Sequence, residues 1–380
     1  MIREYSRPVL SSPRFPLVAL LAATSLATAL ACSSDDDGDA AEPETDTLPL
    51  DAIETVNVPE REFPAPPEPI PGGDTVNGLS VPEQIANWRV IGVVNVLPTG
   101  TGTGTVRVIV GNDIAADAAR AGEVNPWPEG SMISHLQWTA GSTPQSGTAV
   151  TPGAFAAATV MVKNTERYAA DGGWAYGVWR GTDLLPLPAA VPPAAEFDRA
   201  CVACHTSEVA DKDFVFTIPG ALPSQADIDA AVAQPNGLEL PPDILDWRVI
   251  GVASREADAN PTIRVIIGND IAVDAAREGE TNPWPDGAQL AHYVWAAGEN
   301  PDSPNTVNPV GFGAFTLMEK NSVDYAEDSG WAYGAWNGAD LTPLAADGDQ
   351  VCVDCHVASV PDNDYVFTIP GALPPALNTP

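Results

Sequence analysis

Basic side chains are scarce in this 380-residue sequence, which holds 17 lysines and arginines against 51 aspartates and glutamates. The resulting formal net charge of −34 repels phosphate backbones, so nucleic-acid binding is excluded. Acidity of this size keeps an exported protein soluble more often than it marks a partner site, although a basic partner protein would fit it.

Long apolar runs are also missing, apart from one near the N-terminus. Leu17 to Ala31 is too short to span a bilayer, and it follows three arginines and precedes Cys32 and an acidic stretch. We therefore interpret residues 1–31 as a signal peptide. The end of the run resembles a bacterial lipobox, which would make Cys32 a lipid anchor; cleavage by an ordinary signal peptidase, leaving Cys32 as a thiol, is the alternative. Either way we expect export, to the periplasm or the cell surface of a bacterium.

Large apolar residues are few between Cys32 and residue 80, where Asp, Glu, Pro, Thr and Gly dominate. Such a segment cannot bury enough surface to offset its chain entropy, so residues 32–80 are predicted to be an acidic, proline-rich tether. The remainder divides into a domain at 81–223, a linker at 224–240 and a second domain at 241–380.

The two predicted domains are copies of one another. Trp88 to Val93 recurs as Trp247 to Val252, and all 10 tryptophans pair between the copies. The 4 histidines also pair, His135 with His292 and His205 with His356, as do four of the five cysteines. The chain is therefore a duplicated unit with a duplicated site, and we expect two cores.

Short alternating apolar runs favour strands, for example Thr105–Val110, Ser131–Trp138 and Trp174–Trp179. One helix is predicted at Ile114–Ala121, capped by Asn112 or Asp113, with its copy after Asn269 or Asp270. Another short helix is expected within residues 224–234. The predicted fold class is α+β, mainly antiparallel β.

Cysteine and histidine are rare, yet six of the nine fall in two CxxCH motifs: Cys201, Cys204 and His205, and then Cys352, Cys355 and His356. In this motif the thiols add to the vinyl groups of haem and the adjacent imidazole binds the iron, so the sequence predicts two covalent c-type haems. Two alternatives remain: a Cys₂His₂ zinc site that includes His135, and a disulfide within each motif.

Several further segments occur in one order in both copies: Trp88-Arg89, Arg107, Trp127 to Gly130, Val162 to Asn164, Gly173 to Tyr176, and Asp213 to Thr217. With the CxxCH motif, this order resembles the cytochrome P460 family, which includes cytochrome c′-β. The resemblance implies a largely β fold around one c-type haem in each domain. Some members oxidise hydroxylamine and nitric oxide at an open iron site, and others bind small gaseous ligands.

Two departures from that family bear on function. His135 and His292 stand where its oxidases carry a lysine cross-linked to the porphyrin, and Thr159 and Thr316 stand where they carry a glutamate. A threonine cannot act as a carboxylate base, so hydroxylamine oxidation is in doubt. The resemblance implies that His135 and His292 lie beside the haem; they are candidate distal iron ligands, with a hydrogen-bonding pocket role and a plain core role as alternatives.

For four basic residues the sequence indicates less specific roles. Lys163 and Lys320 are expected on the solvated surface. Arg107 and Arg264 are expected either to pair with haem propionates or to point outward from a strand.

The function that accounts best for these features is an exported di-haem c-type cytochrome, lipid-anchored through Cys32, that passes electrons to an unidentified redox partner protein. The alternative is a hydroxylamine or nitric oxide oxidoreductase, or a haem protein that binds small ligands.

Overall fold

The computed structural model describes residues 78–377 except 83, 101, 143–148, 188–194, 257 and 347, and does not describe the side chains of 195–199. The predicted signal peptide, Cys32 and most of the predicted tether lie outside these residues. Within the described ranges, the helices are all too short or too polar to cross a bilayer.

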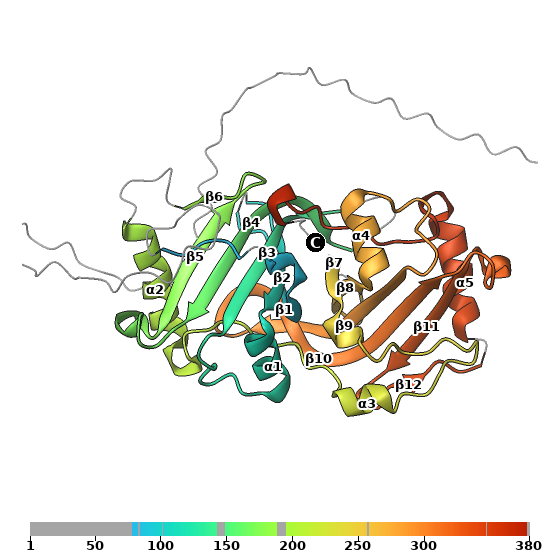
Figure 1. Ribbon diagram of the computed structural model, residues 1–380, viewed down its shortest axis with the longest axis horizontal. Coiled ribbons are helices and arrows are strands. Elements are labelled where there is room, and N and C mark those ends of the chain that lie inside the picture. The colour runs from blue at the N-terminus through green and yellow to red at the C-terminus, as the bar shows by residue number, and fades with distance from the viewer. Residues whose placement is uncertain are drawn as a thin grey trace, which may run out of the picture. The chain divides into compact units, whose positions relative to one another are not determined.

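The strands of both copies join one antiparallel sheet (Figure 1). The first copy supplies β1 (Arg89–Val96), β2 (Thr105–Gly111), β3 (Met132–Gly141), β4 (Thr151–Lys163), β5 (Trp174–Arg180) and β6 (Leu185–Pro186). The second supplies β7 (Arg248–Arg255), β8 (Thr262–Gly268), β9 (Gln289–Asn300), β10 (Ser303–Lys320), β11 (Trp331–Asn337) and β12 (Thr342–Pro343). The order is β6-β5-β4-β3-β2-β1-β10-β9-β8-β7, with β11 paired to β10 and β12 to β11. The predicted α+β, mainly antiparallel class is confirmed.

Five α-helices accompany the described strands: α1 (Asp113–Ala121), α2 (Ala195–Val209), α3 (Gln225–Asp229), α4 (Asp270–Glu278) and α5 (Gly348–Ser359). The predicted helix and its copy are confirmed as α1 and α4, and the short helix near 224–234 is α3. Both CxxCH motifs lie in helices, because α2 contains the first and α5 the second. Helix α2 lies against β5, and α5 against β11 (Figure 1).

The two faces of the sheet serve different purposes, since alternate residues of a strand point to opposite sides. On β3, Leu136 and Trp138 join a core to which both copies contribute. Ile133 points the other way, into a smaller core that belongs to the first copy alone, and the second copy has its own equivalent. The expectation of two separate cores is thus wrong: one shared core lies between two local ones.

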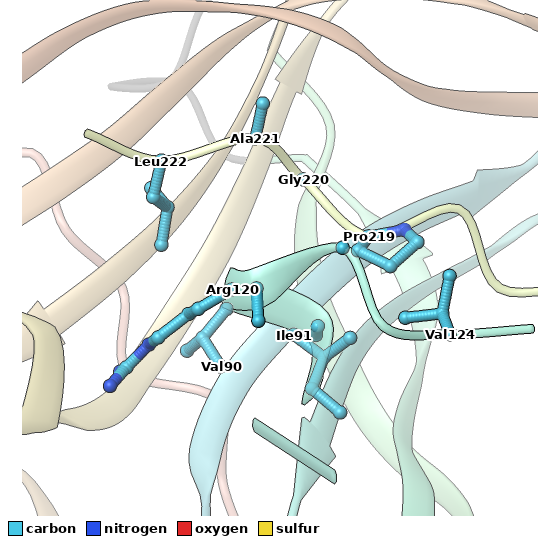
Figure 2. Close-up of a pocket in the computed structure, with 11 residues that line it drawn as sticks. Val90, Ile91, Arg120, Val124, Pro219, Gly220, Ala221 and Leu222 are labelled. Carbon is cyan, nitrogen blue, oxygen red and sulfur yellow. The ribbon is translucent and has the colours of Figure 1, made fainter. Parts of the chain in front are cut away.

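A pocket of about 420 Å³ lies beside β1, where the end of α1 meets the chain that follows α2 (Figure 2). Val90, Ile91, Arg120 and Leu222 are among its lining residues. The chain is held along β1 here because the backbone N–H of Gly220 donates to the carbonyl of Ile91 over 2.9 Å. Among the described residues that line this pocket none is a cysteine or histidine, although Ile91 and Val124 also take part in the local core on which Cys201 packs.

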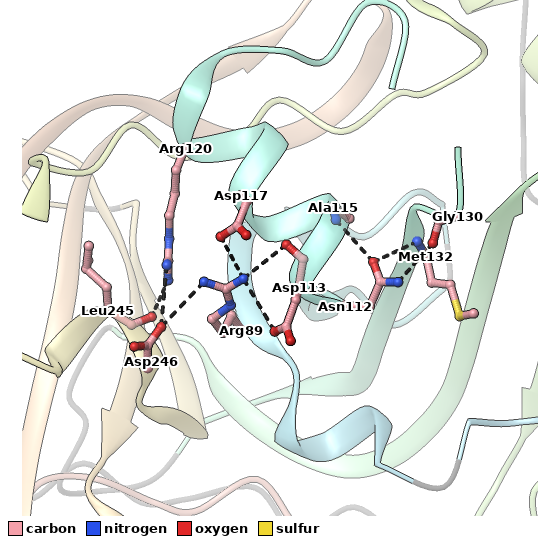
Figure 3. A network of polar contacts seen from close by, with 10 residues as sticks. All are labelled: Arg89, Asn112, Asp113, Ala115, Asp117, Arg120, Gly130, Met132, Leu245 and Asp246. Carbon is pink, nitrogen blue, oxygen red and sulfur yellow. Dashed lines mark hydrogen bonds and ion pairs between the residues drawn. The ribbon is translucent and has the colours of Figure 1, made fainter. Parts of the chain in front are cut away.

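Charged side chains connect the copies beside β1 (Figure 3). Arg89 lies 2.7 Å from Asp117 of α1 and 3.5 Å from Asp246 of the second copy. Arg120 reaches the same Asp246 over 3.5 Å and donates to the carbonyl of Leu245. These contacts link β1 and α1 of the first copy to the segment that precedes β7 in the second.

Asn112 fixes the start of α1 in the same view (Figure 3). Its Oδ1 accepts from the backbone N–H of Ala115 over 3.1 Å and from that of Met132 over 3.0 Å, while its amide donates to the carbonyl of Gly130 over 2.9 Å. One side chain therefore caps the helix and ties it to the start of β3.

Candidate haem sites

The CxxCH motifs are placed at the edges of the two local cores. Cys201 packs against the core of the first copy, and Cys352 against that of the second. Cys352 and Cys355 are both free thiols. The second motif therefore contains no disulfide, and its thiols are available for covalent attachment.

The histidine of each motif has one ring nitrogen already bound. Nδ1 of His205 lies 2.7 Å from the carbonyl oxygen of Phe214, and Nδ1 of His356 lies 2.7 Å from that of Tyr365. Because a carbonyl only accepts, Nδ1 carries the proton in both rings, and the lone pair of a neutral imidazole is then left on Nε2. This is the tautomer that an iron ligand of this motif requires.

Aromatic rings fix the orientation of these imidazoles. The ring centroid of Tyr176 lies 4.6 Å from that of His205, and Phe216 meets the same imidazole edge-on at 4.9 Å. In the second copy Tyr333 and Phe367 take these places around His356, at 4.8 and 4.9 Å. The sequence did not indicate any role for the two tyrosines.

The carbonyl that binds His205 is presented by an unusual stretch of backbone. Asp213 and Phe214 have φ angles of 51° and 62°, in the left-handed region that costs a residue with a side chain about 1 kcal/mol or more. The Asp213 carboxylate holds this conformation by accepting from the backbone N–H of Trp127 over 2.8 Å and from Nζ of Lys163 over 2.6 Å.

The second copy reproduces this arrangement. Asp364 and Tyr365 have φ angles of 45° and 62°, and Asp364 accepts from the backbone N–H of Trp284 over 2.8 Å and from Nζ of Lys320 over 2.7 Å. The expectation of solvated lysines is wrong, because Lys163 is only 4% exposed and Lys320 only 6%. Each ammonium also lies over a tryptophan ring, about 5 Å from its centroid.

His135 and His292 lie on the face of the sheet that carries the local cores. On β3, His135 has the same orientation as Ile133, and the backbone register places it between Ile109 of β2 and Thr159 of β4. Its ring is half-buried. Burial, followed by the charges of Arg107 and His205, lowers the pKa of His135 to about 3.

The second copy again agrees. His292 lies between Ile266 and Thr316, and burial, Arg264, His356 and Arg255 together lower its pKa to about 3. Both distal candidates are thus neutral imidazoles at ordinary pH. Thr159 and Thr316 pair with His135 and His292 in the neighbouring strands.

Arg107 is half-buried on the same face, two residues along β2 from Ile109, the partner of His135, and its Nε donates to Thr105 Oγ1 over 3.3 Å. Burial lowers the pKa of Arg107 to about 10. Burial is also the main cause that lowers the pKa of Arg264. The outward orientation considered from the sequence is therefore wrong for Arg107.

These residues fit a haem. Cys201 and Cys352 pack against the local cores, on the face of the sheet that also carries His135 and His292, whereas Cys204 takes part in a disulfide and Cys355 is exposed. The ring of Tyr333 contacts His356 in a tilted arrangement, and its hydroxyl is buried without a partner among the described residues. A buried hydroxyl of this kind is expected to have an acceptor, which a prosthetic group would supply.

The zinc alternative finds less support. Among the described residues, no group of three or more His, Cys, Asp or Glu side chains is placed to hold a metal ion. In this part of the chain, His135 therefore does not complete a Cys₂His₂ set with Cys201, Cys204 and His205.

No curated protein matches the sequence closely enough to be informative. A family model does match, over residues 82–217 and 241–368, which together make up more than half of the chain and contain both CxxCH motifs as well as His135 and His292. With two tandem matches over the segments that carry these sites, the chain belongs to the cytochrome P460 family.

Proposed function

We propose that this haem c protein is an exported di-haem cytochrome that carries single electrons. One haem is attached at Cys201, Cys204 and His205, and the other at Cys352, Cys355 and His356. His135 and His292 are the sixth iron ligands. The haem supplies a one-electron iron couple, and the residues of this chain decide whether that couple meets another redox centre or a substrate.

The observation that carries the proposal is the pair of neutral imidazoles in each copy. His205 keeps its proton at Nδ1 through the Phe214 carbonyl, and His135 has its pKa lowered to about 3 by burial and by neighbouring charges, which include His205. With both rings neutral and on one face of the sheet, both would be available to hold one haem iron. An iron held by two protein ligands in both oxidation states exchanges electrons with little rearrangement and leaves no position for a substrate.

The environment of the distal histidine favours the carrier over the oxidase. Thr159 and Thr316 occupy the sheet positions beside His135 and His292, and a hydroxyl does not take up protons as a carboxylate base does. Oxidation of hydroxylamine releases protons, and a catalyst for it needs a base at the iron. If the protein were found to oxidise hydroxylamine or nitric oxide, or to bind small ligands at the iron, that function would replace the proposed one.

The location belongs to the same proposal. A signal peptide ending before Cys32 and a diacylglycerol on that cysteine would hold the two haem domains outside the cytoplasm, at the end of an acidic tether. The formal charge of −34 favours a redox partner protein with a basic docking surface.

Two measurements on the purified full chain test the function. Denatured protein should retain its haem, with a pyridine haemochrome count of two per chain, and reductive titration should take up two electrons per chain. Haem that extracts into acidified organic solvent would exclude a c-type cytochrome. Sustained oxidation of hydroxylamine in the presence of an electron acceptor would exclude a simple carrier.

A further inference from the structure

Two of the three lysines in this chain, Lys163 and Lys320, are buried within the local cores, where the electron-carrier function alone gives them no role. Each forms an ion pair with an aspartate that is itself only 9% exposed, Asp213 or Asp364. A buried ion pair gives little net stability over apolar side chains of similar size, because both charges lose their hydration. Stability is therefore a poor explanation for these two pairs.

The position of each aspartate offers a better explanation for the two buried ion pairs. Asp213 immediately precedes Phe214, whose carbonyl accepts the proton of His205 Nδ1 over 2.7 Å. The carboxylate bridges Nζ of Lys163 and the backbone N–H of Trp127, at 2.6 and 2.8 Å, and so holds two consecutive left-handed residues in place. The bridge adds a side-chain anchor to the backbone hydrogen bonds of the loop, in which Phe214 N–H donates to the carbonyl of Val209 over 2.9 Å and Val215 N–H to that of Lys212 over 3.2 Å.

We propose that Lys163 and Lys320 are positioning residues that set the electron donation of His205 and His356 to iron. This proposal rests on the proposed function, since it assigns the motif histidines to haem. Each lysine acts through its aspartate on the carbonyl that binds Nδ1–H. A strong hydrogen bond at Nδ1 makes the imidazole a more basic ligand, and a more basic ligand stabilises ferric iron.

The test replaces the pair in one copy at a time, in the full-length protein. Lys163→Met with Asp213→Asn removes two opposite charges and keeps the net charge, and asparagine tolerates the left-handed conformation. In this variant the Phe214 carbonyl is held less firmly and its hydrogen bond with His205 Nδ1–H weakens, so the midpoint potential of one haem should rise. We expect at least a tenfold change in its ratio of reduced to oxidised haem, which is about 59 mV for a one-electron couple.

Two comparisons separate positioning from general loss of stability. Lys320→Met with Asp364→Asn should raise the potential of the other haem and leave the first unchanged. Ile133→Val removes a methyl group from the same local core without touching the loop, and should leave both potentials unchanged although it lowers stability.

Each remaining outcome is decisive. If both double variants keep two haems with unaltered midpoint potentials, the pairs are merely structural and the proposal fails while the proposed function stands. Loss of a haem from both double variants would mean that the pairs retain haem rather than tune it, which also overturns the proposal. If the unmodified protein has no covalent haem or takes up no electrons, the proposed function itself fails.

Discussion

The indole N–H of Trp295, in the second copy, donates to the carbonyl oxygen of Ala221, in the first, over 2.7 Å. In the opposite direction, the indole N–H of Trp138, in the first copy, donates to the carbonyl oxygen of Ala372, in the second, over 2.8 Å. Each acceptor lies in the chain that leads away from a CxxCH helix. The segment next to one candidate haem site is therefore fixed on a strand of the other copy, three residues from that copy's candidate distal histidine.

Glycine at 220 is required by this contact, because a Cβ there would lie 2.7 Å from the ring of Trp295. Gly220→Ala should therefore reduce the free energy of unfolding by about 1–3 kcal/mol, the usual range for overpacking. Denaturant unfolding measures this. Gly311→Ala is the matched control, since no atom lies within 4 Å of its added Cβ. Equal stability of the two variants would show that the contact between the copies is loose.

Replacing Cys201 and Cys204 by alanine should remove one haem and leave the other. The reason is that each motif lies at a local core made only of residues of its own copy, although the core between them is shared. A pyridine haemochrome count of one per chain, with an unchanged spectrum for the remaining haem, is the expected result. Loss of both haems would mean that the shared core makes the sites interdependent.

Cys32→Ser should release the protein from the membrane. Each buried methylene of a lipid chain contributes about 0.8 kcal/mol, so a diacylglycerol retains a protein firmly. Fractionation with detergent measures the change, and mass spectrometry of the unmodified protein provides the check. A mature chain with an unmodified Cys32 thiol would rule out the anchor.

Local patterns were enough to predict much of the fold. Asn112 and Asn269 cap α1 and α4 as expected, and the alternating runs around His135 and Trp174 are strands. The pairing of β1 with β10 was beyond such reasoning, because a repeat in sequence indicates two similar units without saying whether they share a core. That information depends on which residues of the copies meet in space.

The candidate sites, like the fold, could be predicted from the sequence only in part. The CxxCH spacing indicated the thiols and histidines directly, because all three lie on one turn of chain. Lys163 and Asp213 are 50 positions apart, and nothing near either residue indicates that they meet in a buried ion pair. One signal could have found them: in a chain with three lysines, the second copy also keeps both the lysine and the aspartate.

The central claim, that His135 and His292 are iron ligands, is tested most directly by the spin state of the iron in the purified protein and in single histidine variants. Both haems should be six-coordinate and low-spin when oxidised and when reduced, with slow carbon monoxide binding. His135→Ala and His292→Ala should each give a high-spin signal and rapid carbon monoxide binding at one haem only. An unmodified protein that is already five-coordinate and high-spin would contradict the account and favour a ligand-binding or oxidase function.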